Sequence, residues 1–229
     1  MEGLRARPRL LAAKAHSRLA LAAPARGRYP YGMVTFVTLG PEGTCHHRAV
    51  ANYARFQGLG DDDVRIEFIT DFFDGLEQIR GRDDHFLVQC SAHPGVHEVT
   101  ERHYDEVFVV DTFIYPTKAL AILSRKDLDG PARSLGIVEA TEGYVDLSEW
   151  EVKVPQISKP YAAQALLRGE FDAALTHLEW LDRYPDQLKL DRLIGEVDTT
   201  WVVYGTTKRF AGEVIGIPSP ELYGLTARA

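Results

Sequence analysis

A loop with the sequence Gly-Pro-Glu-Gly-Thr, residues 40–44, stands between a short apolar run and a helical pattern. The run, Val34–Leu39, is rich in β-branched residues and bounded by Gly32 and the loop, which predicts a buried strand. A loop between a strand and a helix offers free N–H groups and the positive end of the helix dipole. We therefore expect residues 40–44 to bind an anion. The other interpretation is an ordinary turn with Thr44 as helix N-cap, because the spacing matches no phosphate-binding motif.

Eight histidines raise the question of a metal site or a proton donor. His93, His97 and His103 are of a type that zinc binds, but a Pro-Gly pair separates the first two and their spacing matches no established site. We expect no metal. His46 and His47 fall in the first turn of the helix after the loop. One of them is a candidate proton donor near neutral pH, and the alternative is a solvated helix histidine.

Two cysteines, Cys45 and Cys90, lie far apart and outside any C-x-x-C spacing. This excludes a disulfide scaffold and a cysteine-rich zinc site, and it fits a reducing cytoplasm. The sequence places no obvious catalytic triad around either cysteine. We interpret both as small packing residues rather than reactive thiols.

Apolar runs alternate with helical patterns along the chain, which is typical of an α/β fold. The first three strands and two helices follow one another in an order that predicts parallel strands. The predicted strands are Val34–Leu39, Val64–Ile69, 86–90, 107–110, 118–123, 134–138, 171–175 and 199–204. The first predicted helix begins after residue 44, and the others cover 72–80, 161–167 and 178–183. Two such α/β units, joined by extended crossings, account for this order.

The length of 229 residues suits one large domain or two small lobes. Hydrophobic residues make up 45% of the chain and charged residues 26%, so the chain can bury a core. No apolar run is long enough for a membrane-spanning helix. The net charge of −7 argues against nucleic acid or an anionic membrane as the main partner.

The charge is unevenly spread. Residues 1–32 hold seven basic residues and one acidic residue, a net of +6, which leaves −13 for the rest. This leader has no long apolar stretch and is a poor secretory signal. We expect a disordered basic leader, with an amphipathic targeting segment as the alternative. The tail, residues 213–229, is too short for a further domain.

Several motifs in order resemble the catalytic domains of prephenate dehydratases. Residues 38–44 (TLGPEGT) resemble the opening motif of that family, and Gly95 and Thr100 match positions of its second motif. Residues 158–163 (SKPYAA) resemble a family helix start, and residues 171–176 (FDAALT) a strand that ends in a small polar residue. The resemblance covers residues 33–205.

The resemblance implies two α/β lobes similar to a type II periplasmic binding protein, with the ligand cleft between them. The first lobe is then expected at residues 33–112 plus 197–212, and the second at residues 113–196. The chain leaves no room for the phenylalanine-sensing regulatory domain that often follows in this family.

Departures from the family motifs point to a related reaction. The Glu-Asn-Ser of the second motif is replaced by residues 90–92 (CSA), and the family's Thr-Arg-Phe by residues 200–202 (TWV). This pattern is similar to the prephenate decarboxylases of natural-product pathways, such as the bacilysin pathway. It implies loss of CO2 from prephenate without aromatisation, giving dihydro-4-hydroxyphenylpyruvate. The alternatives are a diverged dehydratase that forms phenylpyruvate and a non-catalytic protein that binds a small molecule.

The same resemblance implies a set of site residues, for which ordinary strand threonines and helix-capping serines are the alternative. The expected catalytic residues are Thr200, Thr176 and His93, and the expected substrate-binding residues are Gly43, Thr44, Cys45, Ser91, Ser158 and Trp201. A cation should pair with the dianionic substrate, and the sequence does not choose among Arg48, Lys118 and Lys159. We expect no cofactor, a cytoplasmic location and a homo-oligomer.

Overall fold

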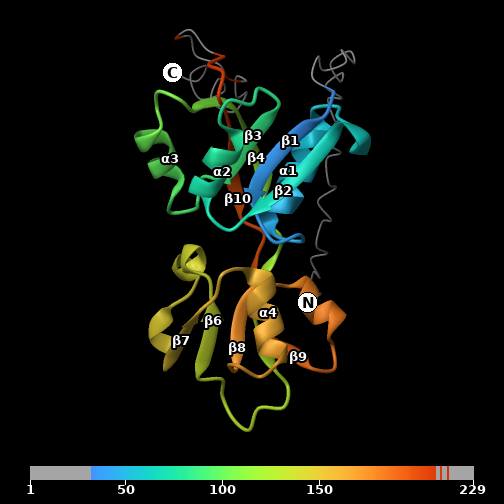
Figure 1. The fold of residues 1–229 in the computed structure, drawn as a ribbon. Helices are drawn as coiled ribbons and strands as arrows, with labels where there is room; N and C mark the ends of the chain where they lie inside the picture. Colours follow the sequence, from blue (N-terminus) through green and yellow to red (C-terminus); the bar gives the residue numbers. More distant parts are fainter. Residues whose placement is uncertain (1–31, 210–211, 213–215, 217–229) are drawn as a thin grey trace, which may run out of the picture.

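The computed structural model describes residues 32–209, Gly212 and Gly216, and it consists of two lobes, each built on a mixed five-stranded sheet (Figure 1). The predicted leader and nearly all of the predicted tail lie outside the described residues. The first lobe contains β1 (Val34–Leu39), α1 (Cys45–Phe56), η1 (Asp61–Asp63), β2 (Val64–Ile69), α2 (Phe72–Ile79), β3 (His85–Cys90), α3 (Val96–Arg102), β4 (Phe108–Pro116) and β10 (Asp198–Gly205). The second lobe contains β5 (Leu120–Arg125), β6 (Ser134–Ile137), η2 (Glu139–Tyr144), η3 (Leu147–Glu149), β7 (Val152–Pro155), α4 (Lys159–Leu167), β8 (Ala173–His177), α5 (Glu179–Arg183) and β9 (Leu188–Gly195).

The sheet of the first lobe has the strand order β2-β1-β3-β10-β4. β1 pairs in parallel with β2 and β3, whereas β10 is antiparallel to both β3 and β4. Alternate side chains of β1 enter different cores, because successive residues of a strand point to opposite faces. Phe36 packs with Val50 and Tyr53 of α1, and Val37 packs with Leu76 of α2. Helices thus cover both faces, which explains why β1 reads as a continuous apolar run.

The sheet of the second lobe has the order β7-β6-β8-β5-β9. β6 is parallel to β7 and β8, and β5 is antiparallel to β8 and β9. Ala162 and Leu166 of α4 pack on one face of this sheet with Leu123 of β5. The other face is covered by the η2–η3 region, including Tyr144 and Trp150.

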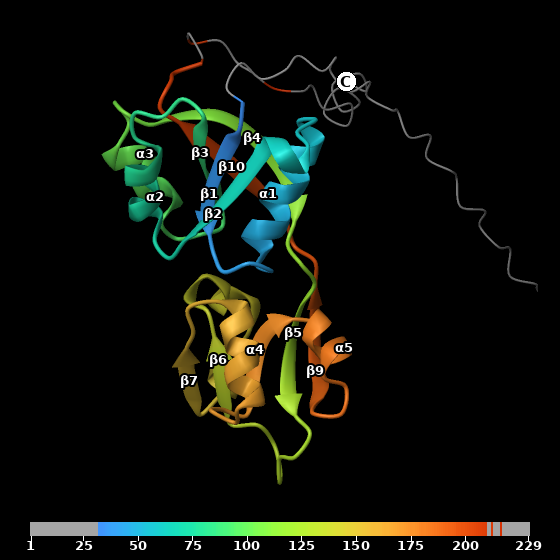
Figure 2. The same ribbon diagram turned by 45° about the vertical axis from the view of Figure 1, so that its right-hand side comes forward.

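Two short segments connect the lobes, one between β4 and β5 and the other between β9 and β10. They run side by side in Figure 2 and are joined by hydrogen bonds. The N–H of Thr117 donates to the carbonyl of Val197 at 2.9 Å, and the N–H of Val197 donates to the hydroxyl of Thr117 at 3.1 Å. The relative position of the lobes is therefore set by a paired connection rather than by a single strand.

The predicted two-lobed α/β class is confirmed, and parallel pairing holds for β1 to β3 and for β6 to β8. The strands β5 and β10 are antiparallel to their neighbours, because each enters its sheet from the connection between the lobes, at the edge where the neighbouring strands end. α3, β7 and β9 were not predicted, and β4 continues to Pro116. The residue bounds of the lobes stay a prediction. Within the described residues, no helix combines the length and the apolar character needed to cross a membrane.

Gly136 in β6 provides a test of packing in the second lobe. A Cβ atom at this position would overlap the ring of Phe171, whereas Gly143 has open space around it. Because an overpacked core loses stability, Gly136→Ala should lower the free energy of unfolding by about 1–3 kcal/mol. Gly143→Ala, the matched control, should change it by less than about 0.5 kcal/mol. Urea unfolding measures both, and equal effects of the two substitutions would contradict this packing.

Candidate functional site

A cleft lies between the two lobes, and both contribute to its walls. The loop after β1 and the start of α1 face the second lobe in Figure 2. Residues from the first lobe and the connection are Leu39, Gly40, Thr44, Cys45, His46, Cys90, Ala92, His93, Thr117, Thr199 and Trp201. Residues from the second lobe are Leu120, Val138, Ala140, Thr141, Tyr144, Ile157, Ser158, Lys159, Pro160 and His177.

Most of these residues follow the carboxyl ends of parallel strands. Leu39 ends β1, Cys90 ends β3, and His177 ends β8. The amino ends of α1 and α4 also reach the cleft, through Cys45 and Lys159. This is the edge of an α/β sheet at which ligands bind, because free N–H groups and the positive ends of helix dipoles collect there.

Lys159 is the one basic residue among those that line the cleft. Arg48, one of the three cations considered from the sequence, donates to the hydroxyl of Tyr115 at 3.2 Å and pairs with Glu196. Lys118 donates to the carbonyl of Gly43 at 2.9 Å and pairs with Glu179 at 2.7 Å.

The half-buried Lys159 differs from both of these cations. Its ammonium makes no ion pair or side-chain hydrogen bond with any residue that the structure describes. No aspartate or glutamate belongs to the described lining of the cleft. Lys159 is therefore the available partner for a ligand carboxylate.

Three histidines line the cleft near Lys159 and are held in the neutral form. Burial lowers the pKa of His46 to about 3, and the charge of Lys159 adds to this effect. Burial and the same lysine lower the pKa of His177 to about 3. The pKa of His93 is lowered chiefly by burial, with Asp71 and Glu139 opposing the shift. At neutral pH these side chains are uncharged imidazoles, so the cleft holds no imidazolium acid.

A cysteine and a histidine meet across the cleft. The Sγ atom of Cys45, the first residue of α1, lies 3.4 Å from Nε2 of His177, the last residue of β8. The backbone N–H of Lys118 donates to the same sulfur at 3.4 Å. Cys90, the other thiol in the cleft, lies 3.4 Å from the hydroxyl of Thr199. Cys45 is thus in contact with an imidazole. The sequence favours Cys45 as a packing residue and does not predict this contact.

Structural hydrogen bonds account for three of the predicted hydroxyl groups, and two of these groups cap helices. Thr44 accepts the N–H of His47 at 3.2 Å and donates to the carbonyl of Leu39 at 3.3 Å. Ser158 accepts the N–H of Tyr161 at 3.3 Å. Both side chains also line the cleft. Thr176 lies outside the lining and donates to the carbonyl of Lys159 at 2.7 Å, so it fixes the backbone of that lysine.

Besides Thr176, three further predicted residues do not line the cleft. Thr200 is exposed, on the opposite face of β10 from Trp201. Because side chains of a strand alternate between its faces, Thr199 lines the cleft together with Trp201. Ser91 is exposed, and its N–H donates to the carbonyl of Thr200. The N–H of Gly43 donates to Nδ1 of His47 at 3.1 Å, so this amide is already engaged.

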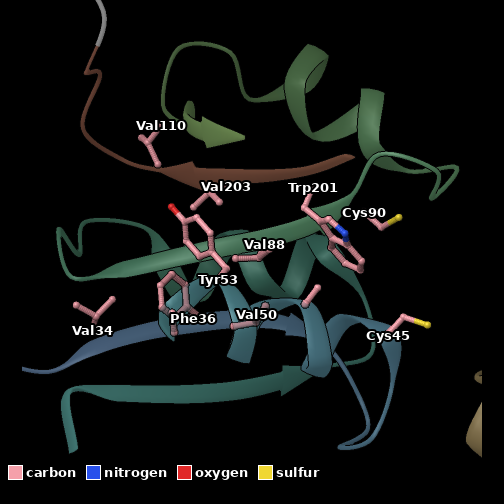
Figure 3. Close-up of a cluster of buried hydrophobic side chains, with 12 residues drawn as sticks. Val34, Phe36, Cys45, Val50, Tyr53, Val88, Cys90, Val110, Trp201 and Val203 are labelled. Carbon is pink, nitrogen blue, oxygen red and sulfur yellow. The ribbon is translucent and has the colours of Figure 1, made fainter. Parts of the chain in front are cut away.

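Trp201, expected from the sequence to bind substrate, contributes an apolar part of the cleft lining. Its side chain is fully buried, and its indole N–H donates to the carbonyl of Tyr115 at 2.9 Å. The ring of His46 stands edge-on to the indole, with 5.0 Å between the centroids. Figure 3 shows Cys45, Cys90 and Trp201 together at one end of the first-lobe sheet.

The prediction missed His177, Thr199, Thr141 and Tyr144. The signal for His177 was its place directly after Thr176, at the end of a predicted strand. Thr141 and Tyr144 lie in η2, a segment without periodicity that sequence patterns do not resolve. Burial raises the pKa of Tyr144, so its phenol stays protonated and can donate a hydrogen bond. Within the described part of the chain, no group of three or more His, Cys, Asp or Glu side chains is placed to hold a metal ion.

Comparison with known proteins finds the same architecture in solved structures. A prephenate dehydratase of Arthrobacter aurescens in complex with L-Phe is 17% identical, with a TM-score of 0.54 over 79% of this chain and 63% of that one. The prephenate dehydratase of Staphylococcus aureus is 14% identical, with a TM-score of 0.53 over 78% of this chain and 68% of that one. The chain thus spans about two thirds of the length of these proteins. No family model and no curated protein sequence matches this chain. At these identities the similarity establishes the fold alone.

The depressed pKa of His177 gives a test of the burial of this side chain. Its folded-state pKa is about 3, below the ordinary value of 6.5, so between these pH values the unfolded chain binds a proton that the folded chain does not. The stability is complete above the unfolded pKa and falls as the pH drops toward the folded pKa, by about 1.4 kcal/mol per pH unit for one histidine. His177→Gln should flatten the pH dependence of the unfolding free energy by about that amount. The exposed His97, changed to Gln, is the control and should leave the slope as it is.

Proposed function

We propose that this chain binds prephenate in the cleft and removes the ring carboxylate as CO2 without aromatising the ring. The product is dihydro-4-hydroxyphenylpyruvate, and the reaction would serve antibiotic or other specialised-metabolite biosynthesis. The observation that carries this proposal is an unpaired ammonium, Lys159, in a cleft whose other described lining groups are neutral. The substrate class rests on the motif resemblance, and the shared fold supports it.

Binding needs a partner for the two carboxylates of prephenate. In this proposal Lys159 pairs with the carboxylate of the pyruvyl arm, and the amino end of α1 adds its partial positive charge. The ring carboxylate then lies against the apolar wall that includes Leu39, Leu120 and Trp201. An unpaired carboxylate is costly in such surroundings, and its conversion to neutral CO2 relieves that cost.

The reaction breaks the bond between the ring and its carboxylate carbon. The electron pair moves into the ring diene, a ring carbon accepts a proton from solvent water, and the ring hydroxyl stays in place. A dehydratase must instead protonate this hydroxyl so that it leaves as water. His46 and His177, with pKa values of about 3, carry no imidazolium proton at neutral pH. No carboxylic acid is present in the described lining of the cleft. These two observations favour decarboxylation over dehydration.

A non-catalytic binding protein is a second candidate. The hydroxyls of Thr44, Ser158 and Thr176 all have structural partners, so their presence at the ends of helices and strands is explained without catalysis. A protein of this kind would bind prephenate or another small carboxylate at Lys159 and release it unchanged.

We further propose that the protein acts in the cytoplasm without a cofactor, which the free cysteines Cys45 and Cys90 support. The homo-oligomer stays a prediction.

Proton NMR of the full chain incubated with prephenate tests the reaction. We expect olefinic ring signals to persist while CO2 is released. Aromatic signals of phenylpyruvate would contradict the proposal in favour of the dehydratase. An unchanged spectrum beside an active dehydratase control, with saturable binding of prephenate, would favour the binding protein.

Substitution of Lys159 tests its role in binding. Lys159→Gln removes the charge while keeping a polar side chain, and should raise KM for prephenate by about tenfold or more, because a hydrogen bond to a charged group contributes about 1.5–3 kcal/mol. Lys153→Gln is the matched control, since Lys153 lies on β7 and pairs with Glu142. Equal KM values for the two variants would refute the assignment.

A further inference from the structure

The contact between Cys45 and His177 has no part in the reaction proposed above. The two residues come from different lobes, and the 3.4 Å between Sγ and Nε2 is within the range of a sulfur hydrogen bond. Both side chains line the cleft, and both are largely buried, with exposed fractions of 7% and 1%. Within residues 32–209, Nδ1 of His177 has no hydrogen-bond partner. The thiol is therefore the one hydrogen-bonding contact of this imidazole ring in that part of the chain.

The surroundings of this pair are electropositive. Cys45 stands at the amino end of α1, and the N–H of Lys118 donates to its sulfur. Lys159, Lys118, Arg183 and Arg48 all act on the imidazole of His177 through their charges, with Lys159 contributing most. The thiol of Cys45 therefore has an imidazole, a helix amino end and several cations around it, and reactive cysteines are found in surroundings of this kind. The adjacent imidazole supplies a base, so the arrangement contains the parts of an activated nucleophile.

Cys90, the other thiol of the cleft, has different surroundings from Cys45. It lies at the carboxyl end of β3, and its Sγ atom is 3.4 Å from a hydroxyl, that of Thr199, rather than from an imidazole. Among the described residues its sulfur makes no hydrogen bond with an imidazole, and no helix begins at this position. The two cysteines are buried to a similar extent, so a difference in their reactivity would come from these surroundings.

We propose that Cys45 and His177 form a nucleophilic pair that adds reversibly to the keto carbon of a small 2-oxo carboxylate, whose carboxylate group pairs with Lys159. The thiol, the base and the cation that this ligand class requires all line one cleft.

The addition balances without a co-reactant. A bond forms between Sγ of Cys45 and the keto carbon, and the π bond of the carbonyl breaks. The thiol proton passes to Nε2 of His177 and then to the carbonyl oxygen, which becomes a hydroxyl. The product is a hemithioketal. Because the pKa of His177 is about 3, the imidazolium is a short-lived carrier that gives its proton up readily.

This inference does not depend on the reaction proposed above. Prephenate carries a 2-oxo acid arm, so a hemithioketal would anchor that arm during decarboxylation. Pyruvate carries the same group without the ring, and it therefore probes the nucleophilic pair alone. A protein that forms the adduct with pyruvate but does not decarboxylate prephenate would support this inference and refute the proposed function.

The first experiment is carbon NMR of the full chain with pyruvate labelled at the keto carbon. We expect a new signal from a carbon with four single bonds, present in the wild type and in Cys90→Ser but lost in Cys45→Ser. His177→Gln should slow exchange between free and bound pyruvate by about tenfold, less than for a general base with a pKa near neutral, because the pKa of His177 is about 3. A wild-type spectrum without the new signal, or a signal that survives in Cys45→Ser, would overturn the proposal.

A second experiment uses the wild type and needs no cysteine variant to fold. The chain is alkylated with iodoacetate or with its neutral counterpart iodoacetamide, and the modified peptides are identified by mass spectrometry. We expect iodoacetate to modify Cys45 well before Cys90, and Lys159→Gln to lower the preference for the anionic reagent by about tenfold, as for the loss of a charged hydrogen bond. Equal modification of both cysteines, or an unchanged preference in the variant, would contradict the assignment.

Discussion

The desolvation of three imidazoles beside one half-buried lysine sets the electrostatics of the cleft. A low-dielectric site disfavours every charge that lacks a partner, and the first groups to lose their charge are those whose ordinary pKa lies closest to neutral pH. His46, His93 and His177 are therefore neutral at neutral pH, and Lys159 supplies the positive charge among the described residues of the cleft lining. A single positive charge in apolar surroundings is a strong attractant for a carboxylate. Both proposals follow from this charge distribution.

The paired connection between the lobes makes this distribution possible. The residues around Lys159 come from both lobes, so they meet only when the lobes approach each other. Contacts across the cleft, from Cys45 to His177 and from Lys118 to Gly43, hold the two halves at this separation. Thr176 anchors the backbone of Lys159 from within the second lobe. Thr176, expected from the sequence to act on substrate through its hydroxyl, thus positions the segment that carries the charged group.

The sequence predicted the architecture better than the site. A short β-branched run such as Val34–Leu39 favours a strand that is buried on both faces. The observed strand β1 has the same bounds as the predicted one. The edge strand β9 was not predicted. Only Leu188 in it is buried, so its residues show no clear alternation of buried and exposed positions. Site prediction from motifs placed Thr200 in the cleft, but a register difference of one residue moves a strand side chain to the other face. The choice of Lys159 among the three candidate cations, and the place of His177 in the cleft, required the fold. The sequence cannot show which cations already have partners or which thiol lies beside an imidazole.

The most direct test of this account is an NMR titration of the histidine side chains in the folded chain, with His46→Gln and His177→Gln used to assign the signals. The account predicts that both imidazoles remain neutral from neutral pH down to the region of their pKa values of about 3, and that binding of a carboxylate at Lys159 raises these values. Titration of His46 and His177 near the ordinary value of 6.5 would contradict it, because the cleft would then hold imidazolium acids able to drive dehydration.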